Sequence, residues 1–153
     1  MYYTGIDLHK KTSFITTVDK KGKIVAKANL PNSRDLILKY FEDLGGETQI
    51  VVESTGSWYW LYDLLTGGGF QVVISNPAKT KAIGSAKIKN DKVDAHMLAQ
   101  LLRSDLVAPV HVSSLKTREL KELLRHRARL VRDTTRMKNR IHHLLLKNNH
   151  QVP

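Results

Sequence analysis

The first 31 residues contain three short strand-like runs, and their close spacing sharply limits the possible folds. Two are rich in β-branched and aromatic residues, and the third alternates apolar with polar residues. The runs cover residues 2–8, 12–18 and 23–30. Runs of this composition favour β-strands, and the connections between them are short; one is the turn sequence Asp19-Lys20-Lys21-Gly22. The chain is therefore predicted to begin with three antiparallel strands.

The pattern changes after Pro31. Ser33 is a candidate N-cap for a helix that continues through Leu44. A buried strand at 49–52, a helix at 58–65 capped by Ser57 and a strand at 70–74 follow, and this succession is typical of a parallel βαβ unit. Residues 76–90 are predicted to be a loop and residues 91–104 a helix. The predicted fold class is α/β, with a mixed five-stranded sheet and flanking helices.

The segment 114–147 contains no helix breaker, so we expect one continuous helix there. A helix of about 34 residues would be about 50 Å long, too long to pack only on a small domain. Apolar residues repeat every seven positions along it: Leu123, Leu130, Met137 and Leu144. The intermediate positions hold Leu120, Arg127, Thr134 and Ile141. This pattern favours a short coiled coil or a hairpin with a partner; the alternative is a helix that folds back onto its own domain.

We therefore divide the chain into an α/β domain at 1–112 and a basic helical segment at 113–153. The first carries 14 basic and 11 acidic side chains, a net charge of +3, and the second carries 11 and 3, a net charge of +8. Such basic surfaces attract nucleic acid, although they also serve solubility alone. The candidate nucleic-acid contacts are Lys79, Lys81, Lys87, Lys89, Lys116, Arg125, Arg129, Arg132, Arg136 and Arg140.

Several classes of protein are excluded by composition. The chain has no cysteine, so it contains neither disulfides nor thiolate metal sites. Its longest apolar run, residues 58–62, is five residues long, whereas a membrane span needs about 20. We also find no secretory signal at the N-terminus and expect a cytoplasmic protein. The chain ends without a closing element, which predicts a fragment of a longer protein.

Four acidic residues occur where the predicted sheet would bring them together. Asp7 ends the first strand and Glu53 follows the fourth, at the point where antiparallel pairing changes to parallel. Ligands bind near such switch points in open sheets. Asp91 and Asp94 share one face of the following helix. Each acid also has an ordinary explanation, as a turn acceptor, a loop residue or a helix-capping group.

A cluster of carboxylates requires a compensating charge. A like-charged pair about 4 Å apart costs on the order of 4 kcal/mol at an effective dielectric constant near 20. A divalent cation removes this repulsion, and a site with only oxygen ligands favours Mg²⁺ or Mn²⁺ over zinc. Such ions support phosphodiester cleavage, singly or in pairs.

Three motifs carry a family resemblance: Gly5-Ile6-Asp7-Leu8-His9-Lys10, Glu53-Ser54-Thr55-Gly56 and Lys89-Asn90-Asp91-Lys92-Val93-Asp94-Ala95. They resemble the N-terminal domain of DEDD insertion-sequence transposases, which are related to the pilin-gene invertase and include bridge-RNA-guided recombinases. The resemblance covers about residues 1–112 and implies the RuvC-like branch of the ribonuclease H fold. It implies that Asp7, Glu53, Asp91 and Asp94 are the catalytic acids that bind Mg²⁺ or Mn²⁺.

The resemblance further implies strand cleavage and exchange in DNA transposition. The implied partners are DNA, a guide RNA and further copies of the chain, joined through the C-terminal helix. The family's nucleophilic serine belongs to a later domain with no counterpart here, so this chain alone is not expected to recombine DNA. Such a protein would act at the nucleoid.

Two other functions fit the same residues. One is a self-sufficient nuclease that cleaves Holliday junctions or RNA–DNA hybrids; the other is a non-catalytic module that binds nucleic acid and oligomerises. Among the remaining residues, His9 is expected to lie on the surface or to orient a phosphate. The aromatic residues between 58 and 62 are candidates for base stacking, although Trp58 shares the helical core spacing of Leu61 and Leu65.

Overall fold

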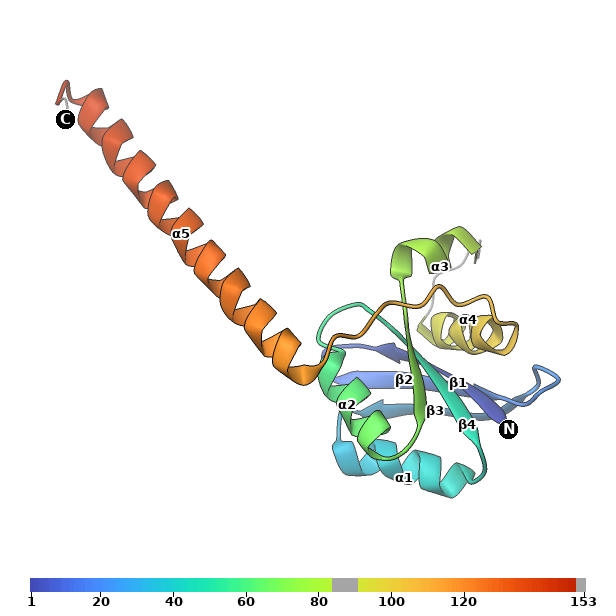
Figure 1. Ribbon diagram of the computed structural model, residues 1–153. Coiled ribbons are helices and arrows are strands. Elements are labelled where there is room, and N and C mark those ends of the chain that lie inside the picture. The colour runs from blue at the N-terminus through green and yellow to red at the C-terminus, as the bar shows by residue number, and fades with distance from the viewer. Residues whose placement is uncertain (84–90, 151–153) are drawn as a thin grey trace. The chain divides into compact units, whose positions relative to one another are not determined.

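The computed structural model describes residues 1–83 and 91–150, and its centre is a five-stranded mixed sheet with helices on both faces (Figure 1). The strands are β1 (Tyr2–Leu8), β2 (Thr12–Val18), β3 (Ile24–Pro31), β4 (Thr48–Glu53) and β5 (Gln71–Ser75). The helices are α1 (Arg34–Leu44), α2 (Tyr59–Gly67), α3 (Pro77–Ile83), α4 (Asp91–Arg103) and α5 (Leu115–Lys147). The predicted mixed five-stranded sheet is confirmed.

The strand order is β3-β2-β1-β4-β5. The strand β1 pairs antiparallel with β2, where Tyr3 lies opposite Val18, and parallel with β4, where Ile6 lies opposite Val52. The strands β4 and β5 are also parallel. The change from antiparallel to parallel pairing therefore occurs at β1, in the middle of the sheet, as the sequence predicted.

The two faces of the sheet have different covers, since successive side chains of a strand point to opposite sides. One face carries Val51, which packs in a cluster with Leu98 and Leu102 of α4. The other face carries Ile6 and its neighbours and is covered by α1 and α2 (Figure 1). The side chains buried there include Ile15, Ile37, Phe41, Ile50, Val52, Leu61, Leu65 and Ile74.

A chain of hydroxyl groups crosses the α1 face of the sheet. The hydroxyl oxygens of Thr4 and Thr17 are 2.7 Å apart, and Thr17 lies 2.8 Å from the hydroxyl oxygen of Tyr40 on α1. Burial raises the pKa of Tyr40, and its hydrogen bond with Thr17 opposes that shift. The network gives polar groups inside the core the partners that burial demands.

Two local predictions were wrong. Residues 77–83, predicted to be part of a loop, form α3, because the side-chain oxygen of Asn76 accepts hydrogen bonds from the amides of Ala78 and Lys79, and Pro77 is preorganised for the first helical position. Ser57 does not cap α2. The N-cap is Trp58, whose side chain is buried, and no side chain makes a capping hydrogen bond there.

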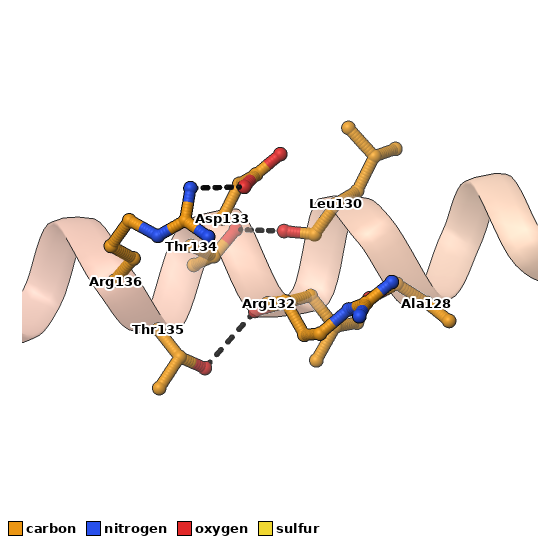
Figure 2. A network of polar contacts seen from close by, with 8 residues as sticks. Ala128, Leu130, Arg132, Asp133, Thr134, Thr135 and Arg136 are labelled. Atoms are coloured by element: carbon orange, nitrogen blue, oxygen red, sulfur yellow. Dashed lines mark hydrogen bonds and ion pairs between the residues drawn. The ribbon is translucent and has the colours of Figure 1, made fainter.

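The chain divides into two compact units, Met1–His111 and Val112–Pro153. The second unit consists mainly of α5, which begins after the N-cap Ser114. Thr134 and Thr135 donate hydrogen bonds to the carbonyl groups four residues earlier, and Arg136 forms an ion pair with Asp133 (Figure 2). No side chain of α5 is buried, so local interactions maintain this helix. Among the described helices, none is long and apolar enough to cross a membrane.

Candidate metal and nucleic-acid site

Asp7 and Glu53 occupy neighbouring positions at one edge of the sheet. The parallel register pairs Ile6 with Val52, so the next residue of each strand, Asp7 on β1 and Glu53 on β4, stands at the same level. Asp7 is buried, with 8% of its surface exposed, whereas Glu53 is partly exposed. The structure therefore brings together two of the four predicted acids through strand pairing.

Both carboxylates are on the sheet face that α4 covers. Gly5 of β1 lies directly beneath α4, against the backbone of Ala95 and Ala99. Val51 of β4 packs on the same helix. Because side chains two residues apart on a strand share a face, Asp7 and Glu53 also face the side of α4.

The direction of α4 places its first turn toward these carboxylates. The side-chain amide of Gln100, near the C-terminal end of α4, donates a 2.7 Å hydrogen bond to the carbonyl oxygen of Gly22. Gly22 lies in the turn between β2 and β3, beside the amino end of β1. The N-terminal end of α4, which begins at Asp91, therefore points toward the carboxyl end of β1, where Asp7 lies.

The two acids of α4 are described to different extents. Asp94 is half-buried and directly precedes Ala95, the residue that lies over Gly5. Asp91 is the first residue of α4, and its side chain lies outside the described residues. Among the side chains that the structure describes, no three acidic or histidine groups are close enough together to hold a metal ion. The four-acid cluster thus stays a prediction.

Close packing between Gly5 and α4 determines how near the helix comes to the sheet. A Cβ atom at Gly5 would overlap the carbonyl oxygen of Ala95 and lie 2.6 Å from the amide nitrogen of Ala99. Ala95 and Ala99 are fully buried. The sequence analysis missed this contact, although the available signal was a glycine in a strand and two alanines four residues apart on a helix.

His9 adds a contact to the acidic edge. Its Nε2 atom lies 3.1 Å from a carboxylate oxygen of Asp7, and its ring packs edge-on against Phe14 at a centroid distance of 5.8 Å. Two residues after the end of β4, the hydroxyl of Thr55 donates a 3.5 Å hydrogen bond to the carboxylate of Glu53. The site therefore offers oxygen donors with a histidine beside them, a set that fits a hard divalent cation.

The predicted nucleic-acid contacts divide between two regions. Lys79 is exposed on α3, while Lys87, Lys89 and the side chain of Lys81 lie outside the described residues. The others are exposed on α5: Lys116, Arg125, Arg129, Arg132, Arg136 and Arg140. The five arginines of this set are spaced by three or four residues, so they form one stripe along the helix.

Some of these arginines also make ion pairs within α5. Arg125 and Arg129 both contact Glu122, at 3.9 Å and 3.3 Å, and Arg136 contacts Asp133 at 3.3 Å. All these groups are more than half exposed, so the pairs contribute little to stability. A phosphate can replace the carboxylate partner at small cost.

Comparison with known proteins agrees with this geometry. Residues 4–149 match the family DEDD_Tnp_IS110, described as a transposase. The transposase for insertion sequence element IS1533 from Leptospira borgpetersenii is 29% identical over 154 residues, covering 95% of this chain and 43% of that protein. The chain therefore spans less than half the length of this relative.

A solved structure supports the fold assignment. The T. thermophilus RuvC structure, in complex with a Holliday junction substrate, superposes with a TM-score of 0.54 and 14% identity, covering 72% of this chain and 99% of that one. At this identity the likeness concerns the fold alone. The predicted RuvC-like, ribonuclease H-type sheet is thereby confirmed.

Proposed function

The chain belongs to the DEDD_Tnp_IS110 transposase family, and from this premise we propose that its α/β unit is the metal-dependent catalytic domain of a DNA transposase. The family and the fold support a DNA-handling domain of the transposase or nuclease type. The finer proposal is that Asp7, Glu53, Asp91 and Asp94 together bind Mg²⁺ or Mn²⁺. The observation that supports it is the direction of α4, whose first turn points toward the edge where Asp7 and Glu53 are neighbours.

The chain's own residues have distinct roles in this proposal. Asp7, buried at the end of β1, is the most rigidly held ligand, and Glu53 supplies a second carboxylate from the adjacent strand. A divalent ion there would stabilise the negative charge on a phosphodiester during cleavage. His9 positions the Asp7 carboxylate through their 3.1 Å contact. The nucleophilic serine, as the family resemblance implies, would come from a domain outside residues 1–153.

A titration of Mn²⁺ followed by calorimetry tests the metal site. Wild-type protein is expected to bind Mn²⁺, and the variants Asp7→Asn and Asp94→Asn are expected to weaken binding at least tenfold, because each removes a charged ligand. Asp43→Asn is the matched control, since Asp43 is exposed on α1, on the other face of the sheet. Equal affinity for the wild type and Asp7→Asn would refute the site. A stand-alone nuclease would instead cleave branched or hybrid substrates without any further domain.

We also propose that the arginine stripe of α5 holds the phosphate backbone of DNA, or of a guide RNA, at the nucleoid. Each neutralised phosphate contributes about 0.9 to the slope of log affinity against log salt on duplex DNA. The double variant Arg132→Gln, Arg136→Gln is therefore expected to reduce that slope by about 2 if each arginine neutralises one phosphate. An affinity that hardly changes with salt would contradict this role.

The apolar stripe of α5 supports a proposal about assembly. Leu130 and Met137 are more than half exposed and lie about a third of a turn around the helix from the arginine stripe. We propose that this stripe pairs with the same stripe of a second copy, forming a coiled coil.

A further inference from the structure

A cavity of about 360 Å³ lies at the same edge of the sheet as Asp7, but on the other side of β1. Its wall includes Leu8, which shares the face of Ile6 and points away from α4. The other side chains that line it are His9, Lys10, Asn32, Ser57 and Trp60. We propose that this cavity binds one unpaired nucleotide of the nucleic acid, with its base on Trp60 and its phosphate beside Lys10.

The size and the aromatic wall of the cavity fit a nucleotide base. Small-molecule sites begin at about 300 Å³, so the volume suits a ligand of nucleotide size. Trp58 is buried and packs against Tyr59 and Tyr62, whereas Trp60 makes no ring contact among the described residues and is only partly buried. Every base has a π-face that stacks on an indole ring.

Two positive groups of the cavity fit a phosphate. Lys10 is exposed and has no ion-pair partner in the part of the chain that the structure describes. The first turn of α2, which contributes Trp60, has no side-chain cap, so its amides and helix dipole attract an anion. The Ser57 hydroxyl, which the sequence had assigned to capping, lines the cavity instead and has no hydrogen-bond partner among the described residues.

The wall opposite α2 is held in place before any ligand binds. The side-chain amide of Asn32 donates a 2.8 Å hydrogen bond to the carbonyl oxygen of His9, and Ser13 donates one of 2.7 Å to the side-chain oxygen of Asn32. The backbone amide of Asn32 also donates a hydrogen bond to the carbonyl oxygen of Lys11. Because these bonds already fix the wall, less conformational entropy is lost when a nucleotide binds.

His9 connects the cavity to the acidic edge, because it lines the cavity and contacts Asp7 at 3.1 Å. A nucleotide in the cavity therefore lies next to the proposed metal ligands. The cavity would anchor the strand by one base while the adjacent phosphate reaches the acids. This inference rests on the proposed function, since it assumes that the acids act on nucleic acid.

Binding to the 153-residue chain in EDTA tests the cavity without any metal. The probes are a short oligothymidylate, the matching oligouridylate, and an abasic oligonucleotide of the same length. We expect the thymidylate or uridylate to bind about 5- to 150-fold more tightly than the abasic strand, because stacking needs a base. In its proposed role, α5 contacts only the phosphate backbone and would not produce this difference. Tighter binding of the thymidylate would identify DNA as the source of the bound nucleotide, and tighter binding of the uridylate would identify RNA.

Point variants test whether Trp60 produces the difference in affinity between base-bearing and abasic strands. Trp60→Ala is expected to abolish the preference for bases, and Trp60→Phe to retain part of it. Tyr59→Ala, an exposed aromatic in the same helical turn outside the cavity lining, should leave it unchanged. Lys10→Ala should weaken base-bearing and abasic strands alike, whereas Lys20→Ala, at the other end of the sheet, should change neither. In the wild type, the indole NMR signal of Trp60 should shift on binding while that of Trp58 stays in place.

The proposal is overturned if the wild type binds base-bearing and abasic strands equally, or if a folded Trp60→Ala variant keeps the preference. Should Trp60→Ala fail to fold, an unshifted Trp60 signal in the wild type overturns it as well. A wild-type chain that prefers base-bearing strands but does not bind Mn²⁺ would reject the metal site alone. Retained Mn²⁺ binding without a base preference would reject the cavity alone.

Discussion

The two units of the chain are maintained in different ways. In the α/β unit, α4 packs on the sheet so closely that Ala95 and Ala99, which lie against Gly5, are fully buried. In the second unit, the 33-residue α5 buries no side chain. A helix without tertiary packing depends on local propensity and side-chain pairs, which are weak. The comparison teaches that tertiary packing stabilises the first unit, whereas the described helix of the second unit is held by local interactions alone.

The largest effect is expected where the first unit is packed most tightly. Gly5→Val should destabilise the protein by about 3 kcal/mol or more, because α4 must move away from the sheet. The control is Gly67→Ala at the end of α2, where a Cβ meets no atom within 4 Å, and the expected change is about 1 kcal/mol or less. Urea unfolding followed by tryptophan fluorescence measures both. Equal stability of the two variants would show that α4 does not depend on close packing.

The second prediction tests whether α5 depends on a partner. Leu130→Lys introduces a charge into the apolar stripe and should raise the dissociation constant of the homo-oligomer at least tenfold, an effect of about 1.4 kcal/mol. Asn139→Lys is the control, since nine residues, or about 2.5 turns, place it on the opposite side of the helix. Sedimentation equilibrium measures the constant. A wild-type protein that is monomeric in this measurement would contradict the proposed coiled coil.

An effect on stability smaller than that of Gly5→Val is expected from the hydroxyl network of the first unit. Thr17→Val leaves the hydroxyl groups of Thr4 and Tyr40 without their shared partner and should cost about 1–3 kcal/mol in the free energy of unfolding. Thr55→Val, at an exposed position, should cost less than about 0.5 kcal/mol. Chemical unfolding measures both losses. Equal losses in the two variants would contradict the prediction and would indicate that water replaces the hydrogen bonds that Thr17 makes.

The smallest effect is expected from pH. Burial, and secondarily the charge of Lys27, lowers the pKa of His96 on α4 below its usual value of 6.5. Below pH 6.5 His96 binds a proton more readily in the unfolded chain than in the folded chain. The free energy of unfolding should therefore fall as pH falls from 7.5 to 5.5. His96→Asn should lose less stability over this range, and Lys27→Ala should show an intermediate loss. Unfolding curves at the two pH values check this, and parallel losses in all three proteins would contradict it.

Elements with strong local signals were predicted well. The runs at 2–8 and 12–18 are strands with those bounds, because β-branched composition and short turns act over a few neighbouring residues. The end of α1 at Leu44 follows from Gly45, whose φ of 61° suits a glycine after a helix. The sequence prediction missed the start of α3 although its signal is also local, because Asn76-Pro77 is equally typical of a loop.

Other features depend on residues that are distant in the sequence. Nothing near Gly5 in the chain indicates that Ala95 and Ala99 lie above it. The cavity beside Trp60 likewise needs β1, the turn after β3 and the first turn of α2 to meet. Asp7 and Glu53 were predicted as candidates by their places at strand ends, and pairing of β1 with β4 confirmed that they are neighbours.

The amino-acid sequence alone determined where the strands and most of the helices form, which residues can supply negative or positive charge to a site, and the long amphipathic character of 115–147, because these properties arise from each residue and its near neighbours. Only the tertiary structure decided which strand ends adjoin, which way α4 runs over them and which aromatic ring lines a cavity rather than the core. Those outcomes depend on how closely distant backbones approach, and that approach is governed by packing between segments, which no local pattern records.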